Sequence, residues 1–169
     1  MSSSKLVIES ERENAEIYHG DEVCKQKCLE WLDEICLPKG VLPVPILDIV
    51  EFGRNRSTGY VWIKLKNKIK EHKFKPINRP VSYDSEITCY SEERRLKKVT
   101  GIKSKEMFIW ITVSDIYIED PSSGKIYFAI PNGMRGDFPV SAFEPEDVKN
   151  NIDDKKTSRN SDHNSKITN

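Results

Sequence analysis

The sequence predicts a mainly β fold: a single antiparallel β barrel or sandwich of about eight strands, with a helical N-terminal segment packed on it. Two observations support this prediction. Before Gly40, apolar residues recur every three or four positions, as they do on one face of a helix. Beyond Gly40 the apolar period becomes two, and β-branched and aromatic residues stand between turn signals.

The N-terminal segment is predicted to be helical over residues 9–35, with a break at Gly20. Asp21 can accept hydrogen bonds from the free N–H groups of a new first turn, so we expect a second helix over residues 22–35. The apolar stripe of this helix should dock on the rest of the domain and is formed by Cys24, Cys28, Trp31 and Ile35.

The β region is predicted to contain eight short strands. We expect them at residues 47–52, 60–66, 69–74, 81–90, 95–100, 107–117, 125–130 and 139–143. Two Gly-containing turns, residues 54–59 and 120–124, each join two apolar runs and predict hairpins. The run at residues 107–113 is apolar at consecutive positions, which predicts a central strand covered on both faces.

The 169 residues fit one domain, and the polar ends are predicted to lie outside it. We expect a flexible N-terminus at residues 1–10, a single helix-plus-β-barrel domain at residues 11–147, and a disordered polar tail at residues 148–169. No stretch has the apolar length of a secretory signal or a membrane-spanning helix. The expected location is therefore cytoplasmic, with any membrane contact peripheral.

The strongest chemical feature is a basic run at residues 54–79, which holds nine basic side chains and one acid, Glu71. Strand alternation predicts that the lysines at positions 64, 66, 68 and 70 share one side of a ribbon if no bulge intervenes. An anionic lipid headgroup or membrane surface is the predicted partner. A charged edge that prevents aggregation explains the same run. The predicted ligand-binding residues are Lys64, Lys66, Lys68, Lys70, Lys73 and Arg79.

Other site chemistry is weak in this sequence. Cys24 and Cys28 lie one helical turn apart, but no second pair of metal ligands stands at a suitable spacing, and buried core side chains explain them better. We expect no metal, no cofactor and no nucleic-acid partner, because zinc-finger and RNA-binding motifs are absent and the net charge is zero. Protein partners are not identified by the sequence.

Six segments together resemble a known family. They are YHGDE at residues 18–22 with Cys24, LPKGVLP at 37–43, GYVWIK at 59–64, RPVSY at 79–83, KKVTGIK at 97–103 and FPVSAF at 138–143. Over residues 11–146 the chain resembles the plant domain of unknown function 538 family. Within it, the chain is similar to the subgroup called smaller trichomes with variable branches. Asp84 and Ser104 depart from the residues usual in the family.

The resemblance implies a closed or sandwiched β fold and two different activities. The family has been likened to bactericidal/permeability-increasing lipid-binding proteins and has also been proposed to hydrolyse chlorophyll esters. For an esterase, Ser82 or Ser141 would be the nucleophile and His72 the base.

Our leading hypothesis is a non-catalytic binding protein for an anionic amphipathic ligand, a phosphoinositide or similar lipid, that regulates plant growth, trichome development or stress response. The alternatives are an esterase acting on chlorophyll-type esters and a regulatory protein–protein interaction module. In the interaction module, the acidic N-terminal helices would form the docking surface.

Overall fold

A computed structural model describes residues 3–144 of the chain. Its two α-helices are α1 (Ser3–Glu11) and α2 (Asp21–Glu34). Its strands are β1 (Glu16–His19), β2 (Ile49–Arg54), β3 (Tyr60–Leu65), β4 (Ile69–Phe74), β5 (Arg79–Glu92), β6 (Arg95–Glu106), β7 (Ile109–Thr112), β8 (Asp115–Tyr117), β9 (Lys125–Ala129) and β10 (Arg135–Pro139). Short 3-10 turns connect them, and the predicted tail at residues 148–169 lies outside the described residues.

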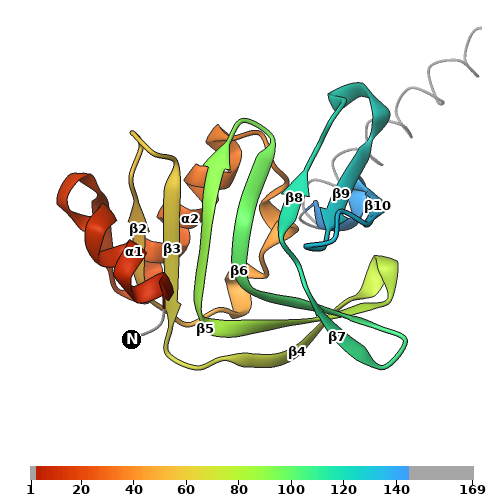
Figure 1. The fold of residues 1–169 in the computed structure, drawn as a ribbon, viewed down its shortest axis with the longest axis horizontal. Coiled ribbons are helices and arrows are strands. Elements are labelled where there is room, and N and C mark those ends of the chain that lie inside the picture. Colours follow the sequence, from red (N-terminus) through yellow and green to blue (C-terminus); the bar gives the residue numbers. More distant parts are fainter. Residues whose placement is uncertain (1–2, 145–169) are drawn as a thin grey trace, which may run out of the picture.

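All ten described strands belong to one antiparallel sheet, which confirms the predicted mainly β class. The main order is β1-β2-β3-β5-β6-β8-β9-β10, while β4 pairs with β5 and β7 pairs with β6 (Figure 1). Within residues 3–144, β1 and β10 are the two ends of this order and do not pair, so the sheet is open, and of the two predicted arrangements the closed barrel is not formed. The two predicted hairpins are present as β2–β3 and β8–β9.

The N-terminal segment differs from the helix predicted over residues 9–35. Ser3–Glu11 form α1, and Glu16–His19 form β1, which extends the sheet beyond β2. The second predicted helix is confirmed as α2, but Asp21 does not cap it. Instead, one carboxylate oxygen of Asp21 accepts a hydrogen bond of 2.8 Å from the backbone N–H of Ile49, which ties the start of α2 to β2.

The two helices cover opposite faces of the β2–β3 hairpin. Successive side chains of β3 point to opposite faces of the sheet. Val61 points toward the main core, which also contains the buried stripe of α2. Trp62 points toward a smaller core that it forms with Ile8 of α1. In the main core, Trp31 packs against Phe52 with ring centroids 5.9 Å apart. The stripe cysteines are buried core residues, and burial raises the pKa of the Cys28 thiol to about 12.

A buried carboxylate joins the N-terminal segment to this hairpin. Glu51 on β2 is 6% exposed, and it accepts hydrogen bonds of 2.8 Å from Trp62 Nε1 and from Arg12 Nη2. His19 Nε2 lies 2.9 Å from its other oxygen. Burial alone would raise the pKa of Glu51, but these hydrogen bonds and the Arg12 charge outweigh it and lower the pKa to about 2. The carboxylate therefore stays ionised inside the fold.

The sheet bends sharply in the middle of its two longest strands. Between β5 and β6 the register shifts from Tyr83↔Ile102 to Thr88↔Thr100, so β5 holds extra residues at the bend. Opposite them, Gly101 has φ +84°, and a Cβ at this position would lie 2.3 Å from the Glu86 carbonyl oxygen. We call the part beyond the bend the distal sheet, which comprises β4, residues 79–84 of β5, residues 101–106 of β6, and β7.

The predicted central strand at residues 107–117 is wrong. The chain reverses direction at Met107 and Phe108, which both have positive φ, so β7 pairs antiparallel with β6. The chain then continues into a separate strand, β8, which pairs with another part of β6. Four consecutive apolar residues, from Met107 to Trp110, are exposed. The predicted last strand at residues 139–143 is also shifted, because β10 ends at Pro139 and Val140–Phe143 form a 3-10 turn.

Replacing Glu51 by Gln should lower the free energy of unfolding by about 1–3 kcal/mol at neutral pH, because Arg12 loses its charged acceptor. The folded pKa of Glu51 lies below its ordinary value of 4.5, so its contribution to stability is present above that value and is lost as the pH falls toward about 2. Urea unfolding between pH 7 and pH 2.5 should show the two proteins converging in acid. A constant difference would contradict the pKa assigned to Glu51.

Gly101→Ala should destabilise the protein much more than Gly124→Ala. Both glycines have positive φ, which costs an alanine about 1 kcal/mol, but only at Gly101 does a methyl group also meet backbone. Thermal unfolding of the two variants measures the difference. Equal melting temperatures would show that the close approach at the bend relaxes without cost.

Candidate functional site

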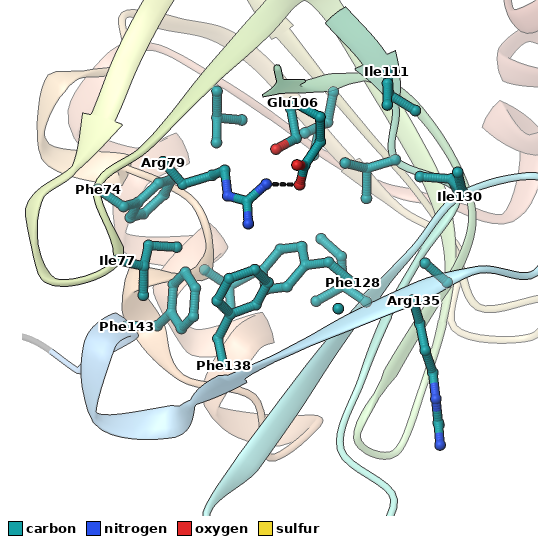
Figure 2. A pocket seen from close by; sticks show the side chains of 18 of the residues that line it. Phe74, Ile77, Arg79, Glu106, Ile111, Phe128, Ile130, Arg135, Phe138 and Phe143 are labelled. Atoms are coloured by element: carbon teal, nitrogen blue, oxygen red, sulfur yellow. Dashed lines mark ion pairs between the residues drawn. The ribbon is translucent and has the colours of Figure 1, made fainter. Parts of the chain in front are cut away.

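An apolar cavity of about 310 Å³ lies between the distal sheet and the C-terminal strands. One wall comes from β5, β6 and β7, and the other from β9, β10 and the turn Val140–Phe143 (Figure 2). Much of the lining is an aromatic cluster. Its ring centroids are 5.3 Å apart for Phe74–Phe143, 5.3 Å for Phe128–Phe143 and 5.6 Å for Phe128–Phe138.

Two opposite charges stand in this apolar wall, Arg79 and Glu106. Arg79 begins β5 and Glu106 ends β6, and the pairing Val81↔Ser104 places them directly across from each other. Their side chains form an ion pair inside the cavity (Figure 2). The guanidinium also lies over the Phe138 ring, 5.3 Å from its centroid, so the aromatic wall and the carboxylate both hold it in place.

Arg135 also borders the cavity, but its guanidinium points away from it (Figure 2). It donates hydrogen bonds to the Tyr117 hydroxyl at 3.0 Å and to Glu119 at 2.6 Å, and it stacks 4.0 Å from the centroid of the Tyr127 ring. Among the described lining residues, the charged groups that face the interior are therefore those of Arg79 and Glu106.

A family model supports the sequence resemblance. The model described as "Protein of unknown function, DUF538" matches residues 28–144, which is more than half of the chain. The chain belongs to the DUF538 family. No curated protein and no solved structure shows a significant match to it.

The DUF538 segment contains every residue that lines the cavity, from Val41 to Phe143. It begins within α2, so α1 and β1 lie before it. The family is described as one of unknown function, so the match assigns no activity to the chain.

The structure distributes the six predicted ligand-binding residues over several places in the DUF538 segment. Arg79 lines the cavity, whereas Lys64 lies on β3 with its Nζ 3.6 Å from Glu51. Lys66 and Lys68 are exposed in the connection between β3 and β4, and Lys70 and Lys73 are exposed on β4. The ribbon that we expected to align the lysines is interrupted after Leu65, and β4 has a register shift of its own. Arg79 alone of the six borders the cavity.

Sequence reasoning missed Glu106 and the aromatic wall. Glu106 stands beside the apolar run that we interpreted as a central strand, so its position across from Arg79 could not be seen. The signal that was available is the concentration of phenylalanines near the C-terminus, at positions 128, 138 and 143. Phenylalanines that point into a cavity have the same sequence pattern as phenylalanines that fill a core.

The residues considered for an esterase are not brought into a hydrogen-bonded arrangement. His72 pairs with Val81 across β4 and β5, and Ser82 points to the opposite face of β5 from Val81. Ser141 lies in the 3-10 turn after β10. Within the described part of the chain, no hydrogen bond joins His72 to either serine. The His72 ring instead packs edge-on against the Phe74 ring, with the two ring centroids 4.9 Å apart. Burial lowers the pKa of His72.

Residues 3–144 contain no group of three His, Cys, Asp or Glu side chains arranged to hold a metal ion. In the same residues, neither helix has the length and apolar character needed to cross a bilayer.

Arg79→Gln should lower the free energy of unfolding by less than about 1 kcal/mol, because the Arg79–Glu106 pair is partly exposed and such pairs contribute little. Thermal or urea unfolding measures the change. A loss of several kcal/mol would instead make Arg79 a structural residue of the distal sheet and would remove it as a binding residue.

Proposed function

We propose that the protein is a non-catalytic binding protein for an anionic amphipathic ligand, a phosphoinositide or similar lipid. The observation that carries the proposal is the apolar cavity with a single arginine–glutamate pair in its wall. Small-molecule sites are typically apolar clefts with a few placed polar groups, and this cavity has that composition.

The size of the cavity limits what enters it. Small-molecule sites usually range over about 300–1,000 Å³, and the cavity lies at the lower end of this range. One hydrocarbon chain or one flat ring system is the expected occupant. The remaining part of a larger lipid would stay outside.

Arg79 is the group that would hold the anion. Its planar guanidinium has five N–H donors, and the contacts to Glu106 and to the face of Phe138 leave donors for a ligand. Glu106 is about half exposed, so an incoming carboxylate or phosphate competes with it at low cost. In this arrangement Glu106 holds Arg79 in position and at the same time opposes anion binding.

The exposed lysines before and on β4 have a supporting role in the proposal. Lys66, Lys68, Lys70 and Lys73 make no ion pair with a carboxylate of residues 3–144. Their combined positive potential would attract an anionic headgroup and raise the rate of association. Lys64 contributes less, because Glu51 lies beside it.

We place this activity in the cytoplasm of a plant cell. The resemblance to the trichome subgroup suggests that ligand binding regulates plant growth, trichome development or stress response. That assignment rests on the family motifs, whereas the ligand class rests on the cavity.

The experiment is displacement of a fluorescent single-chain fatty acid from the purified protein in vesicle-free buffer. Arg79→Gln should weaken binding of the anionic probe at least tenfold, while Glu106→Gln should strengthen it, because the competing carboxylate is gone. A neutral probe with the same chain should respond to neither change. Anionic-probe affinities that move in the same direction in both variants would contradict the assigned roles.

Filling the cavity gives an independent test. Ser104→Phe places a ring inside the cavity and should abolish binding of both probes, whereas Ser82→Phe places the same ring on the opposite face of the neighbouring strand and should leave binding intact. Circular dichroism confirms that both variants fold. If the wild-type protein binds neither probe, the lipid-binding proposal is wrong.

A further inference from the structure

The tip of the β6–β7 hairpin is the most exposed apolar feature of the described structure. Met107 is 89% exposed, Phe108 93% and Ile109 65%, and Trp110 follows at 38%. Soluble proteins rarely place consecutive large apolar side chains in water, and such patches mark interaction sites. We call residues 107–110 the apolar tip. It stands at the far end of the distal sheet, away from α1 and α2 (Figure 1).

The strands that carry the tip have one basic face. Along β6, Ile102, Ser104 and Glu106 line the cavity, so Lys103 and Lys105 point to the opposite face. Lys73 joins them on that face, because its partner Pro80 alternates with the cavity residues Arg79 and Val81. We call Lys73, Lys103 and Lys105 the basic face. No carboxylate of residues 3–144 forms an ion pair with any of them.

The tip and the basic face meet at Trp110. Trp110 is paired with Lys105 in the β6–β7 register, and the Lys105 ammonium lies 5.7 Å from the centroid of the indole ring. An aromatic ring beside a lysine, next to fully exposed apolar side chains, is the combination found where proteins contact the interface of a bilayer. The apolar groups enter the acyl region and the ammonium groups stay among anionic headgroups.

We propose that the apolar tip inserts into the surface of a bilayer that contains anionic lipids, with the basic face against its headgroups. We favour an anionic bilayer as the partner of this surface, because the unpaired lysines of the basic face border the apolar tip and are complementary to negatively charged headgroups. A second copy of the chain would bring the same positive charges together. This docking does not depend on a ligand in the cavity. However, Ile111 and Glu106 of the same hairpin line the cavity, so docking holds the cavity close to the membrane.

Intrinsic fluorescence provides a direct test, because the chain has three tryptophans and Trp31 and Trp62 are 1% and 0% exposed. A change in emission on binding therefore reports Trp110. Addition of phosphatidylcholine vesicles that contain phosphatidylserine should shift the Trp110 emission to the blue, and the protein should co-sediment with these vesicles. Brominated lipids in the same vesicles should quench the Trp110 emission. Pure phosphatidylcholine vesicles should bind at least tenfold more weakly, and high salt should remove most of that difference.

Two variants separate the two parts of the surface. Met107→Ser/Phe108→Ser changes only highly exposed side chains and should weaken binding to anionic vesicles at least tenfold. Lys103→Glu/Lys105→Glu should abolish the preference for anionic vesicles. The same charge reversal at two exposed lysines elsewhere, Lys39→Glu/Lys125→Glu, should alter binding much less.

Ser104→Phe distinguishes docking from ligand binding, because it should retain vesicle binding while losing the soluble fatty-acid probe. Conversely, the tip variant should still bind the soluble probe. Absence of vesicle binding by the wild-type protein, or unchanged binding by the tip variant, overturns the docking proposal. Concentration-dependent dimerisation that disappears in the tip variant would also overturn it, because the tip would then be a contact between copies of the chain.

Discussion

The bend in β5 and β6 is the constraint on which the rest of the structure depends. At this point the Glu86 carbonyl approaches Gly101 so closely that no side chain fits there, and β5 accommodates the turn with extra residues. A straight sheet would leave β9 and β10, which carry Phe128 and Phe138, far from Arg79. Because the sheet bends, its two parts face each other across a space that the aromatic side chains only partly fill. The cavity is therefore a consequence of backbone geometry as much as of side-chain choice.

The ion pair in the cavity shows how a polar pair can be retained in an apolar wall at moderate cost. Arg79 has a carboxylate on one side and an aromatic face on the other, and both side chains keep contact with water. A partly exposed pair contributes little to stability, which fits the recognition role that we propose for it. The deeply buried Glu51 is the opposite case, because three donors hold its charge and it joins separate elements of the fold.

Patterns that are local in the sequence predicted the fold well. The stripe of Cys24, Cys28, Trp31 and Ile35 is buried, and the two Gly-containing turns form hairpins, because each depends on neighbouring residues. The run from Met107 to Trp110 was misinterpreted, because an apolar sequence looks the same whether it fills a core or projects into solvent. Arg79 was predicted as a binding residue from the basic run, but its partner Glu106 could not be predicted, because the two residues meet only through strand register, which no pattern of residue types specifies.

The Glu51 cluster also bears on where the folding unit begins. The family match starts at residue 28, yet Arg12 and His19 contact the Glu51 carboxylate from outside the match, and β1 covers the edge of β2. A recombinant fragment cut at the family boundary would lack the first turns of α2, leave a buried carboxylate without two of its partners and expose an unpaired strand edge. Such a fragment would be prone to aggregate through β2, so the segment matched by the family model is smaller than the segment that these contacts hold together.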